Sequence, residues 1–247
     1  MQVEGGKAIY GASVGILMLE ARFPRIPGDM GNATTWPFPV HYKIVRGATP
    51  DRVVRHGAAG LQEAFVGAAR DLVADGVDGI TTNCGFLSLM QAELQDAVPV
   101  PVATSSLLQV PWVNALLPAG KRAGILTISG STLTDAHLRA AHVPDNTPIG
   151  TTEDGVEFTR AILGNENALD TEAARRDNVD AARALLNTHP ETGAIVLECT
   201  NMVPYAADIC AATRLPVFSI ETFVRWFQSG LVPRRFPAPS DGGHRDI

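Results

Sequence analysis

The sequence predicts an α/β protein of two pseudo-symmetric lobes, each a mostly parallel sheet flanked by helices. Short apolar segments alternate with segments of helical spacing along the whole chain, as in parallel-sheet proteins. One unit also occurs twice: an apolar segment ends at a cysteine, and a proline opens a further short strand 17 positions later. The two copies are Cys84 with Pro101 and Cys199 with Pro216.

The first half of the chain is expected to form one sheet and its helices. Segment 8–19 is rich in Ile, Val and Leu and predicts a buried strand. Segment 20–39 holds four prolines and two glycines and predicts a long loop at the carboxyl end of that strand, where long loops are usually functional. The other expected elements are strands 40–45, 77–83 and 101–103 and helices 61–74, 86–95 and 107–117.

The second half repeats this alternation. Its expected elements are strands 123–128, 193–198 and 216–218 and helices 133–141, 156–163, 172–187, 203–212 and 222–229, with a frayed tail after Pro233. We expect one lobe to comprise residues 1–115 and 219–247 and to carry Cys84. The other lobe would comprise residues 116–218 and carry Cys199, with the active site in the cleft between them.

Composition narrows the classes of function. The 247 residues are 45% apolar and carry a formal net charge of −6, with no Lys/Arg cluster, which argues against a nucleic-acid partner. No apolar run is long enough for a membrane helix, and the first residues lack the basic region of a signal peptide. Three cysteines imply no disulfide framework and favour a reducing compartment, so the cytoplasm is the expected location.

The paired cysteines are the main candidates for chemistry. Taken singly, each is explained as well by packing as by reactivity, but their shared position favours a joint function. Each lies at a strand-to-helix turn, where backbone N–H groups and the helix dipole favour a thiolate. Two thiols facing each other across a cleft could take a proton from one face of a carbon and return it to the other. Cys210 lies inside a helical run and is interpreted as packing.

Other motifs have weaker support. Residues 11–15 match G-x-S-x-G, but they lie within an expected strand rather than at the strand-to-helix turn that a nucleophile elbow requires. The sequence has no phosphate-binding glycine motif and no histidine spacing typical of a metal site.

The chain resembles the aspartate/glutamate racemase superfamily in three segments. Residues 28–34 are similar to the glycine-rich substrate loop that follows strand one. Thr-Asn-Cys at 82–84 matches the first catalytic-cysteine segment, and residues 198–205, with Glu-Cys-Thr-Asn and Pro-Tyr, match the second. The resemblance extends from residue 8 to about residue 230. It implies two lobes, no cofactor, frequent dimers and substrates that bear a carboxylate or a similar planar acid.

The resemblance also implies roles for individual residues. It places Cys84 and Cys199 as the catalytic acid and base, and backbone N–H groups after each cysteine at the substrate carboxylate. The candidate substrate-binding residues are Asn83, Gly85, Phe86, Thr127, Ser129, Thr200, Asn201, Met30, Asn32 and Arg25. No metal is expected.

Three features depart from the family pattern. Amino-acid racemases commonly have Asn-Thr after the first cysteine, where this chain has Gly85 and Phe86. Glutamate racemases commonly have histidine at the position of Asn201. The loop after strand one is longer than usual and brings Arg22 and Arg25 near the cleft. One of them could bind a distal carboxylate or complete a lid, or both could remain solvated.

We therefore expect a cofactor-independent racemase or epimerase, acting on the α-carbon of an amino acid such as aspartate or glutamate, or of a hydantoin-like compound. One alternative is a maleate-type cis–trans isomerase, in which a thiolate adds to an alkene carbon. The other is a small-acid-binding homologue without turnover. The expected partners are a small-molecule carboxylate and further copies of the chain in a homodimer or larger homo-oligomer, and neither nucleic acid nor a membrane.

Overall fold

The computed structural model describes residues 5–237 and contains two four-stranded sheets. The strand orders are β2-β1-β3-β4 and β6-β5-β7-β8. The strands are β1 Val14–Leu19, β2 Val40–Val45, β3 Gly79–Thr82, β4 Val102–Ala103, β5 Arg122–Thr127, β6 Ile149–Thr151, β7 Thr192–Leu197 and β8 Val217–Phe218. All pairings between these strands are parallel, which confirms the predicted α/β class with two lobes.

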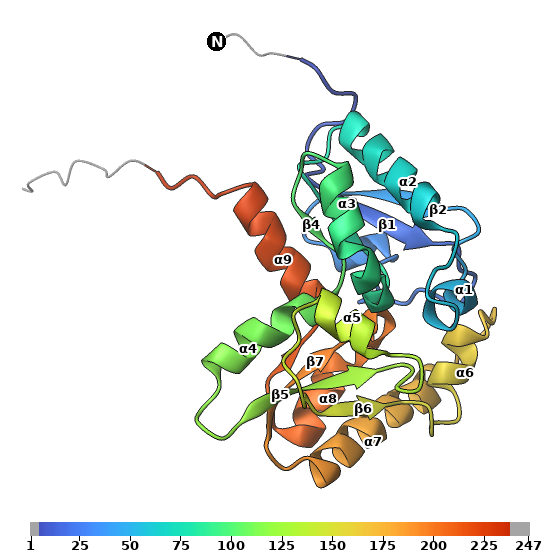
Figure 1. The fold of residues 1–247 in the computed structure, drawn as a ribbon, viewed down its shortest axis with the longest axis vertical. Coiled ribbons are helices and arrows are strands. Elements are labelled where there is room, and N and C mark those ends of the chain that lie inside the picture. The colour runs from blue at the N-terminus through green and yellow to red at the C-terminus, as the bar shows by residue number, and fades with distance from the viewer. Residues whose placement is uncertain (1–4, 238–247) are drawn as a thin grey trace, which may run out of the picture.

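Helices flank both sheets. The α-helices are α1 Pro50–Val54, α2 Gln62–Asp75, α3 Gln91–Ala97, α4 Val110–Leu116, α5 Asp135–Ala140, α6 Phe158–Leu163, α7 Thr171–Thr188, α8 Ala206–Thr213 and α9 Ile220–Leu231. The 3-10 helices are η1 Ala33–Thr35, η2 Gly85–Met90, η3 Ser106–Gln109 and η4 Thr200–Tyr205. In Figure 1 the first sheet with α2 and α3 forms the upper half of the molecule, and the second sheet with α7 and α8 forms the lower half.

Helix α2 illustrates how the sequence specifies these elements. Its apolar residues recur with helical spacing, and Phe65, Ala69 and Leu72 are completely buried. The helix ends at Gly76, whose φ of +111° lies in the left-handed region that favours glycine at a helix C-terminus. The helix therefore occupies nearly the residues predicted for it.

The predicted strand 8–19 is wrong in its first half. Strand β1 begins at Val14, and Gly11 before it has a φ of +88°, which a strand cannot continue through. The short elements α1 and β6 were not predicted. The segments after both cysteines begin as 3-10 helices. Part of the predicted frayed tail, residues 238–247, lies outside the described residues.

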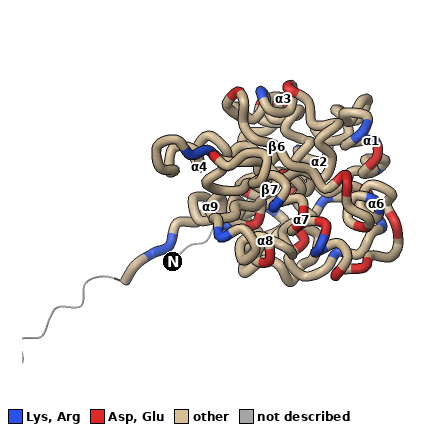
Figure 2. Tube along the Cα trace, turned by 90° about the horizontal axis from the view of Figure 1, so that it is seen from below, with Lys and Arg blue, Asp and Glu red and all other residues tan. Residues whose placement is uncertain are grey.

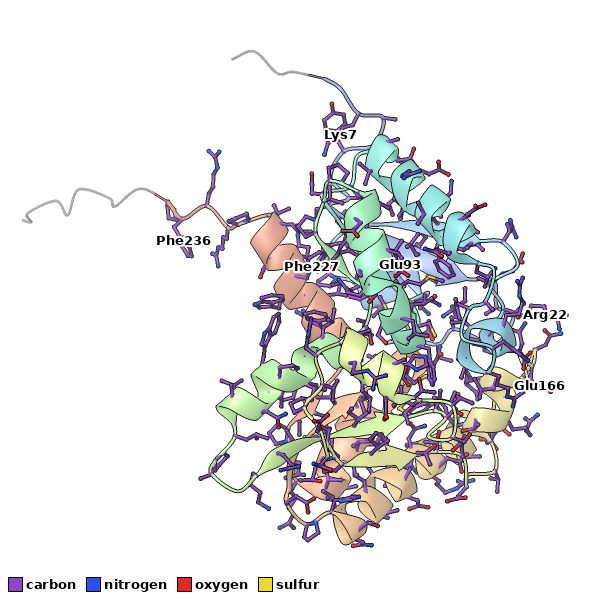
Figure 3. All side chains as sticks on the ribbon, in the orientation of Figure 1. Lys7, Arg22, Glu93, Glu166, Phe227 and Phe236 are labelled. Atoms are coloured by element: carbon purple, nitrogen blue, oxygen red, sulfur yellow. The ribbon has the colours of Figure 1, made fainter. Side chains whose placement is uncertain are left out.

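Helix α9 leaves the second sheet and packs against the first (Figure 1). Gly79 in β3 has no side chain where Phe227 and Leu231 of α9 approach it, and Figure 3 labels Phe227 on this helix. Within residues 5–237, every helix is too short or too polar to cross a bilayer. On the face seen in Figure 2, basic and acidic residues are interspersed.

Candidate active site

A small cavity lies where the carboxyl ends of the four central strands meet. Each of these strands contributes a lining residue at or just after its end. The lining residues are Leu19, Phe23, Pro50, Val54, Asn83, Cys84, Gly85, Phe86, Ile128, Ile162, Leu163, Glu198, Cys199, Thr200 and Asn201. The structure therefore brings the two predicted cysteines together with five of the ten predicted substrate-binding residues.

Cys84 follows β3 and precedes the first residue of η2. Its side chain is buried. Burial is the main reason why the pKa of the Cys84 thiol is raised far above its ordinary value, and the Glu198 carboxylate raises it further. The N–H groups of Phe86 and Leu87 and the Arg25 guanidinium act in the opposite direction, because they favour a negative sulfur.

Cys199 has a matching position, one residue after Glu198 and before η4. Burial again dominates and raises the pKa of its thiol well above the ordinary value, and the charge of Glu198 adds to the effect. Its Sγ lies 3.6 Å from Asn201 Oδ1, to which the thiol donates. The prediction that the helix dipoles produce thiolates is therefore wrong for the resting protein. Desolvation raises the pKa of the two thiols more than the dipoles of the short helices η2 and η4 lower it.

Glu198 is a residue of the cavity to which the sequence analysis gave no role. The residue is completely buried, and burial raises the pKa of its carboxyl to about 7. Oε2 accepts a hydrogen bond from Thr127 Oγ1 at 2.7 Å, whereas Oε1 has no hydrogen-bond partner among the described residues. A β-carbon on Gly85 would overlap Oε1, so this position requires glycine.

The signal for Glu198 was present in the sequence. A charged residue directly follows the apolar segment 193–197, at a position that the repeat places in the protein interior. The glycine after the other cysteine is the complementary signal, since it leaves the space that the carboxyl occupies.

The long loop after β1 connects to the site through a chain of polar contacts. Arg25 Nη1 donates to Asp29 Oδ1 at 2.8 Å, and Asp29 Oδ2 accepts from Asn201 Nδ2. Arg25 also lies over the Phe23 ring, 4.8 Å from its centroid. Its Nη2 is buried and has no partner among the described residues. Arg25 is thus held close to the cavity with one donor unused.

Other predicted residues have structural contacts. Asn83 Oδ1 accepts from the Leu19 N–H at 2.7 Å, and the Asn83 carbonyl accepts from Thr200 Oγ1 at 2.7 Å, which joins the two sheets. Ser129 Oγ donates to Glu153 Oε1 at 2.7 Å.

Met30 and Asn32, like Ser129, do not line the cavity. Met30 is completely buried beneath Trp36, and Asn32 Nδ2 donates to the Arg25 carbonyl. Arg22 is exposed at the edge of the molecule near Glu166 (Figure 3), where its N–H donates to Asn165. Residues 5–237 contain no cluster of three or more His, Cys, Asp or Glu side chains that could hold a metal ion.

Solved structures of racemases and of a decarboxylase share this fold. Glutamate racemase from Bacillus anthracis matches with a TM-score of 0.59 at 15% identity, over 89% of this chain and 81% of that one. An arylmalonate decarboxylase matches with a TM-score of 0.56 at 16% identity, over 91% and 96%. Aspartate racemase from Picrophilus torridus matches with a TM-score of 0.53 at 15% identity, over 89% and 95%.

The chain has the aspartate/glutamate racemase fold. No protein-family model matches its sequence.

Curated sequence relatives of this racemase-fold chain belong to a different enzyme class. A dimethylsulfoniopropionate lyase from Durusdinium sp. clade D is 29% identical over 237 residues, which cover 87% of this chain and 75% of that protein. Dimethylsulfoniopropionate lyases 6 and 5 from Emiliania huxleyi are each 30% identical, over 83% and 88% of this chain. The chain spans 56% and 45% of those two proteins, about half their length.

These relatives overturn the activity expected from the sequence. The proteins are named as lyases, so the predicted isomerase, whether racemase, epimerase or maleate-type, is wrong. Their names give no support to the alternative of a homologue without turnover. The physical reason is that the cysteine segments specify groups that can move a proton. They carry no information about which bond breaks on the neighbouring carbon.

Proposed function

We propose that this protein is a lyase that cleaves dimethylsulfoniopropionate into dimethyl sulfide and acrylate. The observation that carries the proposal is the 29–30% identity to dimethylsulfoniopropionate lyases over more than four-fifths of the chain. The cavity supports it with two thiols for proton transfer and a nearby arginine with an unused donor.

The substrate suits a single-base elimination. Dimethylsulfoniopropionate has a carboxylate, two CH₂ groups and a dimethylsulfonium group. A thiolate removes a proton from the carbon next to the carboxylate, and the electron pair forms a C=C bond. The C–S bond then breaks, and its electrons leave on neutral dimethyl sulfide. The balanced outcome is acrylate, dimethyl sulfide and one proton.

We assign the base to Cys84. Two backbone N–H groups and Arg25 favour a negative charge on its sulfur. Cys199 has one such N–H group, from Asn201, and its other charged neighbours disfavour an anion. Cys199 therefore remains a thiol during the proposed reaction.

We place the substrate carboxylate at Arg25, because a charge-assisted hydrogen bond from the buried Nη2 would satisfy that donor. The apolar side of the cavity is then left for the dimethylsulfonium group. Its lining side chains are Phe23, Val54, Ile162 and Leu163.

The test is to incubate the purified protein with dimethylsulfoniopropionate and measure dimethyl sulfide by headspace gas chromatography and acrylate by NMR. Cys84→Ser should lower kcat by about 10²–10⁴-fold, because a serine hydroxyl does not ionise at neutral pH. Cys210→Ser is the matched control and should keep full activity, since Cys210 is exposed and outside the cavity. A folded wild-type protein that releases no dimethyl sulfide would contradict the proposal.

We further propose that the protein acts in a reducing compartment, the cytoplasm, because the reaction needs free thiols. A homodimer or larger homo-oligomer remains our prediction for assembly. Trp112 and Trp226, which are 50% and 57% exposed and pack edge to face, provide an apolar surface for it. Light scattering coupled to size exclusion would measure the oligomeric state.

A further inference from the structure

Glu198 has no role in the proposed elimination, although it is close to both cysteines. It is the neighbour of Cys199 in the chain, and its carboxyl lies against Gly85, the neighbour of Cys84. Its charge acts on both thiols. Burial of a carboxyl with one oxygen that lacks a hydrogen bond destabilises the folded protein, so we expect this residue to have a function.

The two oxygens of this carboxyl have different surroundings. Thr127 Oγ1 donates to Oε2, and the Ile128 N–H favours the charged form of the carboxyl. Oε1 accepts no hydrogen bond from the described residues and lies beside Gly85. A proton on this carboxyl therefore belongs on Oε1, because a proton on Oε2 would conflict with the donor from Thr127.

The charges around the site limit how many anions it can hold. The groups that act on the thiols are Glu198, Arg25, Asp29 and the other cysteine. The one cation, Arg25, already forms an ion pair with Asp29. Negative charges on Glu198 and on a sulfur oppose each other in this dry environment. The site consequently disfavours a second negative charge among the carboxyl and the two thiols.

We propose that Glu198 and the cysteine pair share a single negative charge, and that Glu198 Oε1 takes the proton that Cys84 must lose before it can act as a base. The S–H bond of Cys84 breaks and an O–H bond forms on Oε1, while the electron pair stays on sulfur. Glu198 thus acts through the sulfur and not on the substrate. Its role in turnover rests on the proposed elimination, whereas the proton exchange itself needs no substrate.

The proton balance of the reaction agrees with this role. After Cys84 takes the α-proton of the substrate, the thiol is restored and Glu198 still holds the first proton. The elimination releases one proton overall, so Glu198 returns its proton to solvent once the products have left. The pKa of about 7 of this carboxyl suits such a release near neutral pH.

The experiment follows the reactivity of Cys84 toward iodoacetamide as a function of pH, without substrate. Mass spectrometry of the peptides measures each cysteine separately, and the exposed Cys210 is the internal standard. The variants are Glu198→Gln and Thr127→Val. Glu153→Gln is the control, because Glu153 is a partly buried carboxylate that accepts hydrogen bonds from serines outside the cavity.

Charge sharing predicts a change of definite sign. In the wild-type protein, alkylation of Cys84 should rise with a midpoint near the pKa of Glu198, about 7. Glu198→Gln should move this midpoint to higher pH by at least about one unit, and alkylation should keep rising above pH 7, because the carboxyl no longer competes with the thiol for the single negative charge. Thr127→Val should move the midpoint in the same direction by less. Glu153→Gln should leave it unchanged.

A carboxylate that only repels thiolates would give the opposite result. Its removal would lower the midpoint, and that outcome, or an unchanged midpoint in both site variants, overturns the inference. Thr127→Val keeps the test valid if Glu198→Gln does not fold, as circular dichroism would reveal. The two proposals can fail separately. Alkylation is measured without substrate, so its result holds even if the protein releases no dimethyl sulfide. An alkylation result that excludes charge sharing does not affect the measurement of dimethyl sulfide release.

Discussion

Gly85 and Glu198 form a matched pair across the cavity. The missing β-carbon of Gly85 leaves the space for the Glu198 carboxyl, and the two residues follow different sheets. The substitution of one residue therefore acts on the other, even though 112 positions between 86 and 197 separate them in the chain. The departure of Gly85 from the Asn-Thr pattern of amino-acid racemases thus has a steric cause within this protein.

Gly85→Ala should abolish dimethyl sulfide release and lower the free energy of unfolding by about 1–3 kcal/mol or more. The added carbon would overlap both Glu198 Oε1 and the Glu198 carbonyl oxygen, and the second of these belongs to the backbone and cannot rotate away. Urea denaturation measures the stability. Gly67→Ala is the control, because Gly67 is exposed in α2 with open space around it and should gain about 0.5–1 kcal/mol. Equal stability of both variants would contradict the steric argument.

The raised pKa of Glu198 predicts how stability depends on pH. Between the ordinary carboxyl pKa of 4.5 and about 7, the folded protein holds a proton on Glu198 that the unfolded chain has lost. The contribution of this group is therefore fully present below pH 4.5 and is lost as the pH rises to about 7. The loss is on the order of 3 kcal/mol. Urea denaturation across this range should show the decline in the wild-type protein and a flatter profile in Glu198→Gln; parallel profiles would argue against a buried, protonated carboxyl.

The residues of the site could be predicted from the sequence in part. The repeat identified Cys84 and Cys199, because an apolar segment before each cysteine and a proline 17 positions after it can be recognised in one sequence. Their protonation state could not be predicted, because it depends on how completely the two lobes exclude water from the sulfurs. Whether the predicted residues contact a substrate remains a prediction.

At the scale of elements, the loop from 20 to 39 determines what lies near the cavity. Its two arginines are three positions apart, yet only Arg25 approaches the thiols. Arg22 is exposed beside α6 at the edge of the molecule (Figure 3). Asp29 explains the difference between the two arginines. It forms an ion pair with Arg25 and accepts a hydrogen bond from Asn201 of η4.

Arg25→Ala should lower kcat/KM for dimethylsulfoniopropionate by about 10–100-fold, since a hydrogen bond to a charged group contributes about 1.5–3 kcal/mol. Arg22→Ala should leave kcat/KM within about twofold of the wild type, because only the backbone N–H of Arg22 makes a contact with α6 and its neighbouring residues. Steady-state kinetics on the two variants measures this difference. A similar loss in both would indicate a general disturbance of the loop rather than a carboxylate contact.

Long, strongly patterned elements were predicted well and short ones were not. Helix α2 and the buried strands have an apolar period that extends over several residues. Strand β6 has three residues and α1 has five, so neither shows a period, and both depend on neighbours distant in the chain. The early start predicted for β1 failed because apolar residues before Gly11 resemble a strand, whereas the left-handed glycine interrupts it.

At the scale of the whole molecule, hydrogen bonds between the two sheets hold the cavity together. Thr200 Oγ1 donates to the Asn83 carbonyl, and Ser106 Oγ donates to the Leu197 carbonyl. Both donors are buried. The repeat in the sequence predicted two lobes, but these contacts could not be predicted, because they join residues 91 or more positions apart.

Thr200→Val should lower the free energy of unfolding by about 1–3 kcal/mol, because it leaves the buried Asn83 carbonyl without this donor. It should also reduce kcat, since Asn83 and Thr200 flank the two cysteines. Thermal unfolding and dimethyl sulfide release measure the two effects. Thr188→Val, which removes a hydrogen bond at the exposed C-terminal end of α7, should cost less than about 0.5 kcal/mol. A loss in Thr188→Val as large as in Thr200→Val would argue against the link between the sheets.

Burial of the two sulfurs also bears on how long the protein survives its own product. Acrylate has an activated double bond to which thiolates add, and in the proposed reaction it forms beside both cysteines. A neutral thiol is a poor nucleophile. A resting state with its negative charge on oxygen therefore protects the cysteines from alkylation by acrylate before this product leaves the cavity. The same arrangement that keeps the resting sulfurs protonated gives the catalyst a long working life.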